Sequence, residues 1–116
     1  MIKVANKRDN LYVGAPFKVY IGRPSPLGNK YSVEEFGRDG CIKLFENDLK
    51  TALKLTELPA DSSYLTGIKN EFKRLVKLYL RHSYLVLECW CAPLACHGSV
   101  IKKYIEADLQ KLTVVK

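Results

Sequence analysis

The chain has 116 residues, the length of one domain, and we expect a single unit over 1–116. Its 47% hydrophobic and 10% aromatic residues suffice for a packed core and exclude an intrinsically disordered chain. Nineteen Lys and Arg against 12 Asp and Glu give a net charge of +7, which favours an anionic partner. No apolar stretch approaches the roughly 20 residues that span a bilayer, and the start lacks the apolar region of a secretory signal. We therefore expect a cytoplasmic protein without a membrane partner.

The elements predicted in chain order alternate between strands and helices. Strands are expected over 2–4 and 18–22, helices over about 39–55 and 63–81, a strand over 84–91 and a helix over about 97–112. The segment 11–17, around Gly14-Ala15-Pro16, fits either a short strand or a turn. This order favours an α/β domain with a small Rossmann-like sheet, at least partly parallel, flanked by three helices.

The first of two loops whose residues are suited to ligand binding follows a predicted strand and has the sequence Ile21-Gly-Arg-Pro-Ser-Pro-Leu-Gly-Asn29. Its prolines stiffen it, its glycines bend it, and a guanidinium beside backbone N–H groups is suited to hold an anion or phosphate. The spacings of a Walker loop or a dinucleotide fingerprint are missing. The alternative is an ordered turn in which Arg23 forms a structural salt bridge. The predicted ligand-binding residues here are Gly22, Arg23, Ser25, Gly28 and Asn29.

The second loop runs from Cys89 to Gly98, where a strand ends, the chain turns at Pro93 and a helix begins near His97. Ligands of open α/β sheets bind beyond the carboxyl ends of the strands, where Cys96 and His97 would lie. Because a helix N-terminus lowers the pKa of a nearby thiol, Cys96 is the best candidate for a reactive cysteine.

Three of the four cysteines fall within eight residues, as Cys89, Cys91 and Cys96. Such crowding disfavours a disulfide framework and favours reduced thiols with a local purpose, or simple packing of Cys89 and Cys91 in the core. A structural zinc is disfavoured because the spacing lacks two separated pairs of ligands. We therefore predict no metal and no cofactor.

Together the two loops resemble those of a small phage and bacterial family that is catalogued as a domain of unknown function. Its members share a Gly-Arg-Pro-Ser-x-x-Gly-Asn-Pro loop and a Cys-Trp-Cys-x-Pro-x-x-Cys-His loop. Lys30 replaces the usual Pro, and Ser99 stands where an acidic residue is common. The resemblance implies that both loops share one pocket, and it more distantly implies a Rossmann-like, nucleotide-handling ancestry.

The leading hypothesis is binding of a nucleotide-derived small molecule between the Gly22–Asn29 loop and the helix start at Cys96 and His97. Trp90 and Tyr31 are available to stack on a base. In a phage, such a domain would sequester a host immune signalling nucleotide, an inference by analogy alone. The alternative is an enzyme acting on a nucleotide, nucleoside or base, with Cys96 as nucleophile and His97 as acid or base. Nucleic-acid binding ranks third because the basic residues are scattered, and the oligomeric state is left open.

Overall fold

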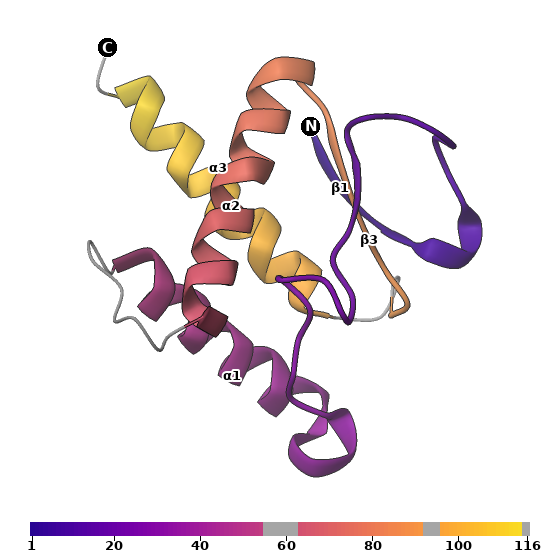
Figure 1. Ribbon diagram of the computed structural model, residues 1–116, viewed down its shortest axis with the longest axis vertical. Helices are drawn as coiled ribbons and strands as arrows, with labels where there is room; N and C mark the ends of the chain where they lie inside the picture. The colour runs from indigo at the N-terminus through magenta and orange to yellow at the C-terminus, as the bar shows by residue number, and fades with distance from the viewer. Residues whose placement is uncertain (55–62, 92–95, 115–116) are drawn as a thin grey trace.

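The fold alternates strands and helices as expected for an α/β domain. The computed structural model describes residues 1–54, 63–91 and 96–114, and of 111–114 only the backbone (Figure 1). The elements are β1 (Ile2–Asn6), the 3-10 turn η1 (Lys7–Asp9), β2 (Lys18–Tyr20), α1 (Val33–Lys54), α2 (Ser63–His82), β3 (Leu85–Cys89) and α3 (His97–Val114). The predicted α/β class is confirmed.

The three strands of the described residues form one sheet in the order β1-β3-β2. β3 lies in the centre and pairs in parallel with both neighbours, so that Leu87 is level with Val4 of β1 and Val19 of β2. Because all three strands run in one direction, their carboxyl ends meet at the same edge. The loops that follow β2 and β3 therefore begin side by side.

Alternation along β3 separates the two faces of the sheet. Leu85, Leu87 and Cys89 belong to the apolar core that the helices complete, whereas Val86 and Glu88 point to the opposite face. In Figure 1 the three helices lie on one side of the sheet, in keeping with this alternation. Glu88 is buried on the other face, where the Lys18 ammonium lies 3.7 Å from its carboxylate.

The starts of α2 and α3 agree with the predicted ones and their ends lie within two residues of them, but the start of α1 differs. The periodicity predicted a start near Asp39, but α1 begins at Val33. Gly37 interrupts it with a φ of +73°, so a short first turn precedes the main helix. The Ser32 hydroxyl accepts a hydrogen bond from the Glu35 N–H (3.1 Å) and caps this first turn.

The segment 11–17 forms turns, and the predicted strand over 84–91 is reduced to five residues. Tyr12 and Phe17 pack edge-on against each other, and both contact the ring of Tyr84, just before β3. The predicted end of the first helix at Leu55 and the turn at Pro93 lie outside the described residues. No helix within the described ranges has the length and apolarity needed to cross a membrane.

Candidate ligand-binding site

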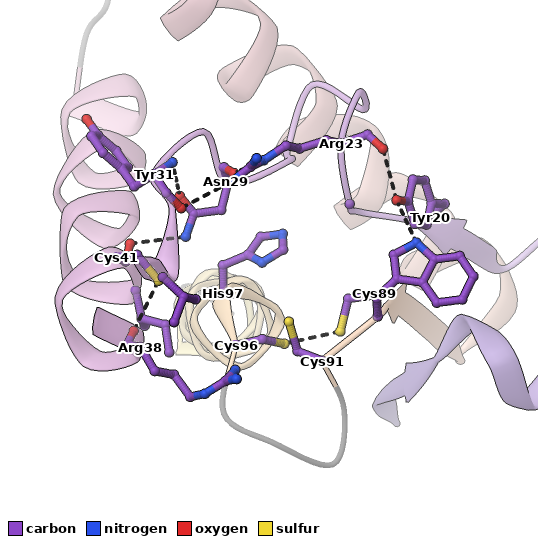
Figure 2. Close-up of a pocket in the computed structure, with 14 residues that line it drawn as sticks. Tyr20, Arg23, Asn29, Tyr31, Arg38, Cys41, Cys89, Cys91, Cys96 and His97 are labelled. Carbon is purple, nitrogen blue, oxygen red and sulfur yellow. Dashed lines mark hydrogen bonds between the residues drawn. The ribbon is translucent and has the colours of Figure 1, made fainter. Parts of the chain in front are cut away.

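A pocket of about 430 Å³ opens at the carboxyl edge of the sheet, between the loop after β2, the first turns of α1 and the start of α3 (Figure 2). Its volume is within the range of roughly 300–1,000 Å³ that is typical of small-molecule sites. Both loops singled out in the sequence contribute to it. Six of the eight predicted ligand-binding residues line it, namely Gly22, Arg23, Asn29, Trp90, Cys96 and His97.

The loop after β2 is held by the side chains that were expected to bind a ligand. Arg23 donates from Nε to the carbonyl of Asn29 (2.6 Å) and from Nη2 to the carbonyl of Tyr31 (3.3 Å). The Asn29 amide donates to the carbonyl of Cys41 in α1 (3.1 Å), and its oxygen accepts from the Tyr31 N–H (3.0 Å). Instead of a salt bridge, Arg23 therefore makes two bonds to carbonyls, and its Nη1 makes none with the described residues.

Ser25 and Gly28 do not line the pocket, and both shape the loop. The Ser25 hydroxyl accepts a hydrogen bond from the N–H of Leu27, whose side chain is fully buried. A Cβ on Gly28 would lie 2.9 Å from the Gly22 carbonyl oxygen and 3.0 Å from the Cα of Arg23, closer than such atoms approach. Glycine at position 28 thus allows the loop to fold back on itself.

His97 ties the start of α3 to the loop. Its Nε2 lies 2.7 Å from the carbonyl oxygen of Ile21, which can only accept, so Nε2 is assigned the proton. The ring also packs edge-on against Phe45, with 5.0 Å between centroids. Burial lowers the pKa of His97, and hydrogen bonding to the carbonyls of Ile21 and Leu27 only partly offsets this effect. The lowered pKa favours the neutral ring, which the bond to Ile21 and the contact with Phe45 hold in place.

Cys96 differs from the sequence expectation. Its Sγ lies 3.2 Å from the Sγ of Cys89, and the Gly98 N–H approaches it at 3.4 Å. The hydrogen bond to Cys89 and burial raise the pKa of the Cys96 thiol, and the Gly98 N–H lowers it by less. The expected lowering by the helix N-terminus is outweighed because the sulfur is buried beside a second thiol.

Trp90 presents an open aromatic face beside the pocket. The side chain is 55% exposed, yet its Nε1 donates to the Tyr20 hydroxyl (3.2 Å), which in turn donates to the carbonyl of Arg23 (2.9 Å). The indole is thus oriented before any ligand arrives. Tyr31 lines the pocket too, but its hydroxyl donates to Asp48 (2.7 Å) and its ring packs against Phe36.

Sequence reasoning missed Arg38, Tyr20 and Cys41 among the residues that line the pocket. Arg38 follows the interruption of α1 at Gly37, and in the view of Figure 2 it lies on the other side of the His97 ring from Arg23. The only available signal was a glycine next to an arginine at a helix start. Among the described residues that line the pocket there is no Asp or Glu, so its formal charge is positive.

The described residues contain no group of three or more His, Cys, Asp or Glu side chains arranged to hold a metal ion. This finding includes the cysteines and His97 at the pocket.

The fold and the pocket define a small α/β domain with a cationic site at the carboxyl edge of a parallel sheet. Residues 4–107 match a domain of unknown function, DUF4326, and the chain belongs to this family. No match was found among curated proteins or solved structures.

Proposed function

We propose that the pocket binds a nucleotide-derived small molecule, with its phosphate held by arginine and its base against Trp90. The single observation that carries this proposal is the pairing of two arginines with an exposed indole in one pocket, without a carboxylate among its described lining residues. A phosphate requires cationic donors and a base requires an aromatic face.

The two arginines have different parts in this proposal. Arg23 is oriented by its bonds to the carbonyls of Asn29 and Tyr31, which leave Nη1 for a ligand oxygen. Arg38 enters the pocket from α1, across the His97 ring in Figure 2. A phosphate in the pocket would be attracted by both positive charges, and Arg23 would bond to it through Nη1.

The test is calorimetric titration of the chain with a panel of nucleoside monophosphates and diphosphates, ADP-ribose and cyclic dinucleotides. Arg38→Ala should weaken binding of the panel member that binds by about 10- to 100-fold, since hydrogen bonds to charged groups contribute roughly 1.5–3 kcal/mol each. Arg81→Ala is the matched control because it removes the same charge from the exposed end of α2. Equal loss in both variants, or no binding by wild type, would contradict the proposal.

Binding without turnover fits the chemistry of the pocket better than catalysis does. The raised pKa of Cys96 keeps it a thiol at neutral pH, and His97 Nε2 is bonded to Ile21. A protein that sequesters a signalling nucleotide needs affinity for it and no catalytic activity. Binding of the cyclic dinucleotides in the panel tests this role. Recovery of the ligand unchanged after overnight incubation is the expected result.

A further inference from the structure

All four cysteines of the chain line the same pocket, although Cys41 is far from the others in sequence. Cys89 ends β3, Cys96 immediately precedes α3, and their sulfur atoms are 3.2 Å apart (Figure 2). A disulfide bond is about 2.05 Å long, so the two sulfurs need to approach by only roughly 1 Å. The proposed nucleotide site uses Trp90 and the two arginines, and neither sulfur has a part in it.

The two thiols are not equivalent. The hydrogen bond to Cys89 and burial raise the pKa of the Cys96 thiol, which disfavours Cys96 as the sulfur that attacks first. The first attack is therefore assigned to Cys89 and the second to Cys96. Both side chains are nearly inaccessible from outside, and the pocket is the route by which a small reagent reaches them.

We propose that Cys89 and Cys96 are a redox-active dithiol, which a hydroperoxide small enough to enter the pocket oxidises to a disulfide. This proposal concerns the thiols alone and does not rest on the proposed nucleotide ligand.

The reaction has two steps. The Cys89 sulfur attacks the terminal peroxide oxygen, the O–O bond breaks, and an alcohol or water leaves with the Cys89 proton, which gives a sulfenic acid. The Cys96 sulfur then attacks the Cys89 sulfur, the S–O bond breaks, and the hydroxyl leaves as water with the Cys96 proton. Two electrons pass from the sulfurs to the peroxide.

The other two cysteines provide the controls. Cys41 is buried and lines the pocket, but its Sγ donates to the carbonyl of Arg38 at 3.2 Å within its own helix. Cys91 is half-buried and lies near enough to Cys96 to influence its ionisation. Cys41→Ser therefore matches the burial and the pocket position without touching the pair, and Cys91→Ser tests the nearest competing thiol.

The experiment treats the reduced full chain with one equivalent of hydrogen peroxide and then blocks the remaining thiols with N-ethylmaleimide in denaturant. Intact mass should show the loss of two of the four thiols. Chymotrypsin cuts after Trp90 and Leu94, which separates the three clustered cysteines, and the map should link Cys89 to Cys96. Cys41→Ser and Cys91→Ser should retain that link, and dithiothreitol should remove it.

Cys96→Ser should lose the link and accumulate a sulfenic acid at Cys89, which dimedone traps. If that variant does not fold, the peptide map of the oxidised wild-type chain is sufficient to show which two cysteines are linked. A link to Cys91 or Cys41, or four thiols remaining after peroxide, would overturn the proposal. A metal ion bound in the native mass spectrum, with thiols that react only after a chelator has removed it, would also overturn the proposal.

Discussion

His97 is an ionisable side chain placed where a charge would be costly. Burial holds its pKa below the ordinary value of 6.5, so below that pH the unfolded chain takes up a proton that the folded chain resists. The contribution of His97 to the free energy of unfolding is therefore complete above pH 6.5. It is lost as the pH falls from there through the lowered pKa.

This loss is measurable as a decline in urea stability between about pH 7.5 and 5, where histidine is the side chain that normally titrates. His97→Gln should lower stability at neutral pH because the ring packs against Phe45, and it should flatten the decline. His82→Gln, at the end of α2, should leave the decline in place. An unchanged pH profile in His97→Gln would refute the assignment.

Arg23 illustrates a limit of prediction from sequence at the scale of one residue. The loop composition indicated an anion site or a structural salt bridge; in place of the salt bridge, the Arg23 guanidinium bonds to the carbonyls of Asn29 and Tyr31, and the anion site stays a prediction. No sequence pattern distinguishes a carbonyl from a carboxylate as the acceptor, because every residue carries a carbonyl. Arg23→Ala is therefore expected to loosen the loop as well as weaken binding.

At the scale of elements, the start of α1 depends on the conformation of one glycine. A side chain at Gly37 would be strained by the φ of +73°, although nothing lies within 4 Å of its added Cβ. With a ψ of 165°, this backbone conformation is essentially restricted to glycine, so Gly37→Ala should cost about 1–3 kcal/mol of stability. It should also weaken ligand binding, since the first turn of α1 and Arg38 contribute to the pocket.

Gly40→Ala is the matched control three residues further along the same helix. Its Cβ would meet only the Phe36 Cβ, at 3.4 Å, and the backbone there has no positive φ. Alanine favours a helix over glycine by up to about 1 kcal/mol, so this variant should be as stable as wild type or more so. Urea titrations of both variants decide between strain and propensity; equal stabilities would argue against strain at Gly37.

The elements themselves were largely predictable because each has a strong period. Apolar residues such as Ile68, Phe72, Leu75 and Val76 recur on one side of α2, and its start at Ser63 was expected. The early start of α1 was not predictable, since glycines at 37 and 40 have low helix propensity and obscure its first turn. The low helix propensity of the glycines is outweighed by the cap that the Ser32 hydroxyl provides and by tertiary contacts.

Across the whole molecule, tyrosine hydroxyls connect the helices to one another by donating to carboxylates on α1. Asp48 accepts from Tyr31 before α1 and from Tyr64 of α2, and Glu46 accepts from Tyr104 of α3. Burial, with Glu46 adding to it, raises the pKa of Tyr104 to about 12, and the pKa of Tyr64 is raised from 10 chiefly by burial. The pKa of Tyr31 is raised mainly by its bond to Asp48.

These raised values predict a loss of stability in alkali. Below pH 10 the tyrosines are protonated in both states and their contribution is complete. As the pH rises from there through the folded pKa values, the unfolded chain loses protons that the folded chain retains, so the free energy of unfolding falls. Lysines also titrate in this range, so a decline in the wild type alone does not identify the tyrosines. The measurement is therefore the free energy of unfolding at about pH 8.5 and 11, compared between the wild type and variants that lack one tyrosine hydroxyl.

Tyr64→Phe and Tyr104→Phe should each start less stable at the lower pH and lose less stability on going to the higher one. A decline as steep in both variants as in wild type would show that other groups cause it.

The meeting of two distant loops in one pocket is the part of the site that the sequence supports best, since it requires only parallel strands with a common carboxyl edge. Arg23, Asn29, Cys96 and His97 do line one pocket. The hydrogen bonds that use several of these side chains were not predictable. They depend on how closely the loop approaches α1 and α3, which is set by core packing and not by local pattern.

The central place of β3 also governs the order in which the chain can fold. β1 and β2 do not pair with each other, and each finds its hydrogen-bonding partner only in residues 85–89. During synthesis at about 5–20 residues per second, the first strand therefore waits several seconds for a partner. Meanwhile α1 and α2, which contact each other directly, have the shorter path to association. A nascent chain arrested before Leu85 should carry helices but no sheet, and hence no pocket.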